Sequence, residues 1–187
     1  MPATWTATVM APGSPTRTIT AAAGPRLGTD APRHRPVGRI GGMTGVHDHA
    51  AAAALGARLG PGAQVLPDRH DGRLHVTADW DACWINREPV RSLEDWRAIV
   101  AAGTLADVDG AFAVAWLDAD GTLWLARDAI GERTLYYAQR DRAVVFASTL
   151  HAVLATGLVE RSVNPAALGA YLAYRSEERR VGKECRL

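Results

Sequence analysis

The stretch from Leu123 to Leu154 reads LWLARDAIGERTLYYAQRDRAVVFASTLHAVL, and it carries the clearest structural signals of the chain. Its apolar runs predict three short strands, at Leu123–Ala126, Leu135–Tyr137 and Ala143–Ala147. Two polar turns separate these strands, at Arg127–Gly131 and Gln139–Arg142. A helix is predicted to begin at Ser148, with Leu150, Val153 and Leu154 on one face.

The first of these turns contains Arg127, Asp128 and Gly131, which could contribute to catalysis. A structural interpretation is preferable, because an aspartate accepts hydrogen bonds from turn amides and a glycine adopts positive φ without strain. We therefore expect Asp128 to cap the turn and Gly131 to supply its left-handed residue.

The rest of the chain adds strands and a few helices. Further strands are predicted at Gly38–Thr44, Ala63–Leu66, Leu74–Thr77 and Ala111–Trp116, and helices at Ala50–Leu59 and Ser92–Val100, with Ser92 as N-cap. Asp118–Gly121 is a hairpin signal. This order predicts an α+β fold with packed sheets and helices outside, and a core that includes Phe112, Val114, Leu125, Leu135 and Val145.

Three segments together resemble a known family. They are VDGAFAVAWLD at 108–118, ARDAIGERTLYY at 126–137 and RSVNPAALGAYL at 161–172. From about Asp79 to Tyr174 the chain is similar to the class II glutamine amidotransferase domain of the asparagine synthase family. That resemblance implies a four-layer α-β-β-α sandwich of two antiparallel sheets, of the N-terminal-nucleophile hydrolase type.

The resemblance also locates a catalytic position. In the family an N-terminal cysteine attacks the glutamine amide, and its own α-amino group acts as the base. Residues 37–42, VGRIGG, are similar to the family's opening Met-Cys-Gly-Ile-x-Gly. Gly38 stands where the cysteine would be, and glycine has no side chain to act as a nucleophile.

The glutamine-binding motif is altered as well. The family's Asn-Gly-Glu-Ile-Tyr-Asn matches residues 81–86, in which Asp81 replaces the first Asn, Cys83 replaces the Glu and only Asn86 is kept. A further S/T-D-x-E context is missing between Arg87 and Leu105. These losses resemble the erosion in β-lactam synthetase and lasso-peptide cyclase relatives, so we expect no glutamine hydrolysis. From its apolar neighbours alone, Cys83 is interpreted as a small buried hydrophobe.

Both ends of the chain differ from the middle. Residues 1–36 lack a signal-peptide core and are expected to be a disordered leader or to follow from a misplaced start, with Val37 as the natural start. The run 175–187 contains the only lysine, Lys183, and resembles the translation of a sequencing-adapter oligonucleotide. The domain is therefore expected to span 37–174, truncated before a synthetase domain, and no Cys83–Cys185 disulfide is inferred.

Composition excludes several function classes. The 187 residues have a formal net charge of +1 and no basic stripe, so no nucleic-acid partner is indicated. No apolar run has membrane length, and the scarcity of cysteine suits a reducing cytoplasm. His47-Asp48-His49 could suggest a metal, but a polar loop or helix N-terminus is the preferred interpretation, and no metal site is expected.

These observations leave three functional hypotheses. The first is the N-terminal fragment of an asparagine synthase-like, amide-forming ligase. Its partner would be the missing C-terminal synthetase domain of the same chain. That domain would use ATP and Mg²⁺ and would act on a peptide or a small amino-acid-derived substrate. The fragment itself is expected to need no cofactor. The second is a non-catalytic scaffold or partner-binding module. The third is a hydrolase that uses Thr44 or another nucleophile after processing.

Overall fold

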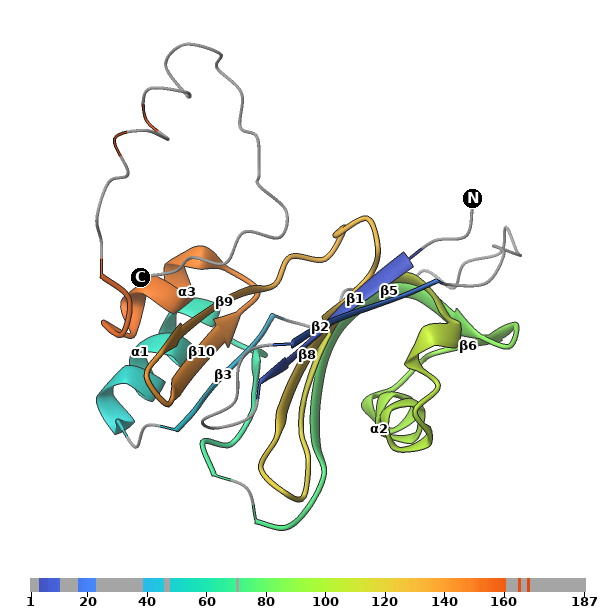
Figure 1. Cartoon of the computed structure of the whole chain (residues 1–187), viewed down its shortest axis with the longest axis horizontal. Coiled ribbons are helices and arrows are strands. Elements are labelled where there is room, and N and C mark those ends of the chain that lie inside the picture. The colour runs from blue at the N-terminus through green and yellow to red at the C-terminus, as the bar shows by residue number, and fades with distance from the viewer. Residues whose placement is uncertain are drawn as a thin grey trace.

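The computed structural model describes residues 39–45, 48–69 and 71–160, the single positions Pro165 and Leu168, and the backbone of 4–10 and 17–22. Two sheets pack face to face, with helices on both outer sides (Figure 1). Helices α1 (His49–Leu59) and α3 (Leu150–Ala155) cover one sheet, and α2 (Leu93–Ala102) covers the other. The predicted α+β sandwich with its α-β-β-α layers is therefore confirmed.

The larger sheet has six strands in the order β2-β1-β8-β7-β5-β6, and all its pairings are antiparallel. Its strands are β1 (Thr4–Met10), β2 (Arg17–Ala22), β5 (His75–Ile85), β6 (Glu88–Pro89), β7 (Val108–Leu117) and β8 (Leu123–Arg127). The hairpin predicted at Asp118–Gly121 joins β7 to β8, and the amide of Asp118 donates to the carbonyl of Thr122 at 2.9 Å.

The smaller sheet has four strands in the order β4-β3-β10-β9. They are β3 (Ile40–Thr44), β4 (Gln64–Val65), β9 (Tyr136–Arg140) and β10 (Ala143–Ala147). The pair β3 and β4 runs parallel, because helix α1 connects the two strands and returns the chain in the same direction. The remaining pairs are antiparallel.

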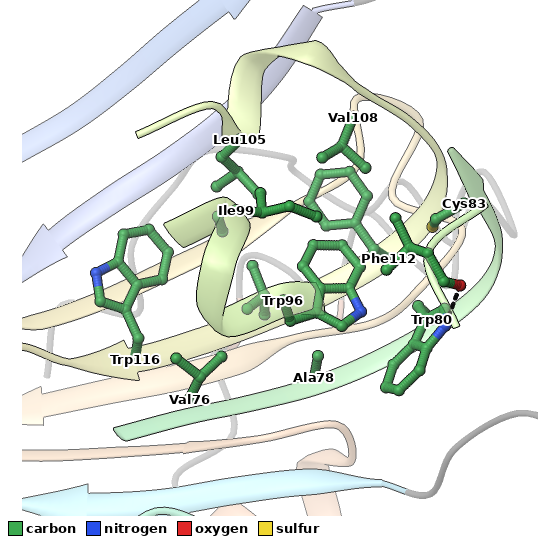
Figure 2. Close-up of a cluster of buried hydrophobic side chains, with 13 residues drawn as sticks. Val76, Ala78, Trp80, Cys83, Trp96, Ile99, Leu105, Val108, Phe112 and Trp116 are labelled. Carbon is green, nitrogen blue, oxygen red and sulfur yellow. Dashed lines mark hydrogen bonds between the residues drawn. The ribbon is translucent and has the colours of Figure 1, made fainter. Parts of the chain in front are cut away.

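Three apolar clusters hold the layers together. The cluster between the sheets includes Leu125, Val144 and Phe146, with the half-buried Leu135 packed against it. The cluster under α2 is rich in aromatic residues, and Trp96 lies 6.0 Å from Trp80 and 5.3 Å from Phe112 between ring centroids (Figure 2). A third cluster lies under α1 and α3. The predicted core residues Phe112, Val114, Leu125 and Val145 are fully or almost fully buried.

Helix α2 begins where the sequence predicted. Ser92 is its N-cap and accepts a hydrogen bond from the amide of Asp95 at 3.2 Å, while the Asp95 carboxylate accepts from the amide of Ser92 at 2.9 Å. This reciprocal capping box satisfies amides that have no partner inside the helix. The cap fixes the entry of α2 so that Trp96 and Ile99 are buried against β5 and β7.

The N-terminal segment differs from the expected disordered leader. Residues 4–10 and 17–22 form the hairpin β1–β2, and β1 pairs with β8 from Thr6↔Arg127 to Met10↔Leu123. The sequence signal was present but weak, because TWTATVM alternates Thr with other residues and is rich in strand formers. The edge of β8 supplies hydrogen-bond partners for the backbone of β1. A start at Val37 stays a prediction.

Helix α3 begins at Leu150, two residues later than predicted, and its buried face differs in part. Thr149, rather than Ser148, caps the helix and accepts from the amide of Ala152. Leu150, predicted on the apolar face, is 48% exposed, whereas Ala152 and Val153 are buried. Ser148 is still bonded to β3, because its amide donates to the carbonyl of Ile40, and the helix begins only after it. Apart from Pro165 and Leu168, the segment 161–172 that resembles the family, and all of residues 175–187, lie outside the described residues.

Strand β5 is longer than the predicted Leu74–Thr77, because it pairs with β7 as far as Ile85, and it contains a β-bulge. Asp81 pairs with Ala111 and Trp84 pairs with Asp109, so Ala82 and Cys83 lie opposite the single residue Gly110. Ala82 has φ 49° and Gly110 has φ 124°. A Cβ at Gly110 would lie 2.3 Å from the Ala82 carbonyl oxygen, so the bulge requires glycine there.

No helix in the described part of the chain is long and apolar enough to cross a membrane.

The bulge predicts a large effect of Gly110→Ala. The new methyl group would meet the Ala82 carbonyl and the residue would be held at a strained φ, so we expect a loss of about 2–4 kcal/mol in the free energy of unfolding. Urea denaturation measures this loss. The matched control is Gly56→Ala inside α1, where nothing lies within 4 Å of the added Cβ and a gain of about 0.5–1 kcal/mol is expected. Equal stabilities of the two variants would contradict the assignment of the bulge.

Candidate functional site

The candidate site lies in the middle of β5, on the face toward the smaller sheet. Before the bulge, the even-numbered residues Ala78 and Trp80 point into the cluster under α2. Asp79 and Asp81 therefore point to the opposite face, which β5 shares with Ala113 and Ala111 of β7. Strand alternation thus places two carboxylates side by side in the space between the sheets.

Arg133 pairs with both carboxylates. Its Nη2 lies 3.2 Å from Oδ2 of Asp81, and its Nη1 lies 3.8 Å from Oδ1 of Asp79. Burial raises the pKa of the Asp79 carboxyl, Arg133 opposes that rise, and the neighbouring Asp81 charge adds to it. Asp79 is the more buried of the two acids, and the arginine supplies the positive charge that offsets its desolvation.

The turn that presents Arg133 is organised by Asp128, which is 6% exposed. Oδ1 of Asp128 accepts from the amides of Gly131 at 2.6 Å and Glu132 at 3.0 Å. Oδ2 accepts from the amides of Arg133 at 3.1 Å and Phe112 at 3.2 Å. One carboxylate therefore satisfies four backbone donors and ties the turn to β7.

Arg127 and Gly131 pack against each other inside this turn. Gly131 has φ 72°, and a Cβ there would lie 3.0 Å from Nη1 of Arg127. Arg127 pairs with Ala113 of β7, so it lies on the same face of the sheet as Asp79. The three turn residues that the sequence singled out thus lie together at the edge of the candidate site, where they shape the backbone.

Cys83 is turned away from Asp81 by the bulge. The extra residue shifts the alternation, so Cys83 and Ile85 point into the cluster under α2, where Trp80 and Trp96 also lie (Figure 2). The thiol is 1% exposed, and its Sγ lies 3.3 Å from the carbonyl oxygen of Ala111. Burial raises the pKa of the Cys83 thiol to about 12, and the nearby Asp128 and Asp81 charges add to the rise.

Asn86 occupies the tip of the hairpin between β5 and β6. Ile85 pairs with Glu88, so Asn86 and Arg87 form a two-residue turn, and both have positive φ, at 52° and 71°. Asparagine tolerates the left-handed conformation that this type of hairpin turn needs. Its position in the turn gives Asn86 a backbone role at a distance along the strand from Asp81.

The N-terminus of α2 lies in the stretch between Arg87 and Leu105 where the S/T-D-x-E context is missing. Ser92-Leu93-Glu94-Asp95 has a serine at the first position and an acid at the fourth, and these two residues form the capping box. The second position, which would be acidic, is Leu93, and its side chain packs against the cluster under α2.

Several sequence candidates lie elsewhere. Gly38 and His47 are outside the described residues. Asp48 caps helix α1, and its Oδ1 accepts from the amides of Ala50 and Ala51 at 2.9 and 3.0 Å. Within the described ranges, no three His, Cys, Asp or Glu side chains are grouped so that they could hold a metal ion.

Sequence reasoning missed Asp79 and Arg133. The strand alternation of Asp79 and Asp81 was a usable signal for two acids on one face. Nothing in the sequence indicated that Arg133 would reach them, because that contact joins a turn after β8 to the middle of β5. Sequence reasoning also missed Ser148, whose Oγ accepts a hydrogen bond from the amide of Ile40 in β3 at 2.9 Å.

Comparison with known proteins gives one result for this chain. Residues 96–184 match the model of a family described as glutamine amidotransferase domain. The match begins inside α2 and includes Arg127, Asp128 and Gly131, while Asp81, Cys83 and Asn86 precede it. Its end reaches into the segment 175–187, whose adapter origin stays a prediction. Searches of curated proteins and of solved structures gave no match.

The arrangement around Asp128 predicts a strong effect of Asp128→Asn. An amide keeps one acceptor oxygen but directs its own N–H groups at two of the four backbone donors, so a loss of about 2–5 kcal/mol in stability is expected. Chemical denaturation measures it. Asp48→Asn is the matched control, because only one carboxylate oxygen accepts there and asparagine caps helices as well as aspartate. A loss at Asp128 no larger than at Asp48 would contradict this account.

The environment of Cys83 predicts a protected thiol. With a pKa of about 12, about one thiol in ten thousand is ionised at pH 8, and the group is also buried. In a Cys185→Ser chain, we expect the reaction with a disulfide reagent to be slow at pH 8 and to become rapid in denaturant. Because the folded pKa is raised, the contribution of Cys83 to stability is present below pH 9 and is lost as pH rises toward 12. Rapid labelling of the folded chain at pH 8 would contradict the burial.

Proposed function

We propose that this chain supplies the amidotransferase-type domain of an ATP-dependent, amide-forming ligase that resembles the asparagine synthases, and that the domain does not hydrolyse glutamine. The family match over residues 96–184 and the two-sheet sandwich support the domain type. The ligase parentage follows from the ordered resemblance of residues 108–118, 126–137 and 161–172 to the asparagine synthase family.

The observation that carries the loss of hydrolysis is the face switch at the bulge. An amidotransferase of this type needs polar groups that hold glutamine and a nucleophile that attacks it. Cys83, at the motif position that would recognise the substrate's α-amino group, points into the apolar cluster under α2. Asp81, at the start of the same motif, is paired with Arg133. Gly38 is a further reason to expect no hydrolysis, because glycine at the nucleophile position has no thiol that could attack glutamine.

The proposed parent enzyme would use a tethered amine in place of ammonia. Its synthetase domain, with ATP and Mg²⁺, would convert a substrate carboxylate to an acyl-adenylate with release of pyrophosphate. An amine of the same peptide or amino-acid-derived substrate would then attack the acyl carbon, and AMP would leave. A domain with this role needs no ammonia source, which is consistent with an altered glutamine site.

The genomic DNA downstream of the Tyr174 codon distinguishes the ligase from the scaffold. A Ser-Gly-Gly-x-Asp-Ser sequence in frame would support the ligase, since that loop binds pyrophosphate in the family. A stop codon soon after Tyr174 would instead favour the scaffold.

The activity prediction is that the full chain releases no glutamate from L-glutamine above buffer. The measurement is a coupled glutamate assay at pH 7.5, with Cys83→Ala as the control variant and an active glutaminase as the positive control. Glutamate release that survives Cys83→Ala would point to another nucleophile, such as Thr44. Release that disappears in Cys83→Ala would give Cys83 the catalytic role that its buried position argues against.

A further inference from the structure

The contact between Arg133 and the two acids of β5 resembles a bound ligand more than a surface ion pair. The guanidinium approaches two carboxylates with two different nitrogens, and both acids come from one strand face. The Arg133 side chain is only 22% exposed, unlike Arg97 of α2, which pairs with Glu94 and is 48% exposed. A planar group with several donors is well suited to such a two-carboxylate site.

We infer that Arg133 is a tethered cation that fills a site formed by Asp79 and Asp81, and that it keeps small cationic ligands out of this end of the space between the sheets. Without the Arg133 side chain, the site would take a guanidinium or a primary ammonium, such as the α-ammonium of an amino acid. The contact is thus an autoinhibitory one, made by the chain's own turn.

Small side chains lie beside the two acids. The residues of β7 directly opposite Asp79 and Asp81 are Ala113 and Ala111. The Arg133 guanidinium reaches both acids, and its Nε is buried without a hydrogen-bond partner in the part of the chain that the structure describes. The arginine is therefore held through its two terminal nitrogens, as a separate guanidinium ion would be.

The backbone of Arg133 is held in place independently of its side chain. Its amide donates to Oδ2 of Asp128, and Thr134 next to it donates from its hydroxyl to the carbonyl of Ser148 at 2.8 Å. These bonds persist when the side chain is shortened, because none of them uses the guanidinium. Removing the side chain should consequently leave the turn in place and expose the acidic pair.

The assignment of this place as a former glutamine site rests on the proposed function, because Asp81 is matched to the family's binding motif. The cation site itself does not depend on it. Cation binding is measured without glutamine, so failure of the glutamate assay and failure of the cation experiment are separate results.

The test compares Arg133→Ala with Arg97→Ala by thermal unfolding of the full chain. Each variant is measured with ethylguanidinium chloride at millimolar concentration and with the same concentration of potassium chloride. We expect Arg133→Ala to melt below the parent chain and to regain about 3–6 °C with ethylguanidinium in a saturable manner. The parent chain should show no such gain, because its Arg133 side chain already occupies the acidic site. Arg97→Ala should show none either, because the Arg97–Glu94 pair that it removes is exposed to solvent.

A second variant keeps the test decisive if Arg133→Ala does not fold. Asp79→Asn with Arg133→Ala removes the buried charge together with its partner, so we expect this double variant to fold and to show no gain with ethylguanidinium. If Arg133→Ala is insoluble, recovery of folded protein by refolding in ethylguanidinium is the readout. The proposal is overturned if Arg133→Ala shows no gain or recovery, if the parent chain gains equally, or if the double variant gains as much.

Discussion

The β-bulge between β5 and β7 is the constraint on which the other features of this site depend. Two residues of β5 lie opposite Gly110 alone, and this one extra residue reverses which side chains face which layer. Before it, Asp79 and Asp81 face the other sheet, and after it, Cys83 and Ile85 face α2. A strand without the bulge would place Asp79, Asp81 and Cys83 in one row, because side chains alternate with a period of two. The bulge therefore places Asp81 in a charged environment and Cys83, two residues later, in an apolar one.

Burial gives these environments their different chemistry. Cys83 lies among tryptophan and aliphatic side chains, where an ionised thiolate would lose its hydration without gaining a partner, and its pKa rises to about 12. Asp79 is also partly buried, but Arg133 offsets the cost of its charge. The same strand thus holds a neutral thiol on one face and an ion pair on the other.

The turn after β8 connects this strand to the rest of the molecule. Asp128 satisfies four amides, one of them on β7, and so determines where the chain leaves the larger sheet on its way to β9. Because the Arg133 amide is one of the four, its side chain is directed toward β5. Ser148 completes the arrangement from the smaller sheet, since its Oγ accepts from Ile40 and its carbonyl accepts from Thr134.

The sequence by itself determined the elements that depend on local chemistry. The Ser92 cap, the Asp118–Gly121 hairpin, the strands around the 127–131 turn and the two-sheet α+β class all follow from patterns within a few residues of one another. It did not determine the hairpin at 4–22, in which β1 pairs with the edge of β8. Nor did it determine the later start of α3, which follows the bonds between Ser148 and Ile40. For the site, it indicated Asp81, Asp128 and Gly131 and correctly predicted that Cys83 is buried, but it gave no sign that Arg133 meets Asp79 or that a bulge turns Cys83 away from Asp81. Those two outcomes depend on pairing between segments about 30 to 50 residues apart, where a single extra residue on one strand reverses every side chain that follows.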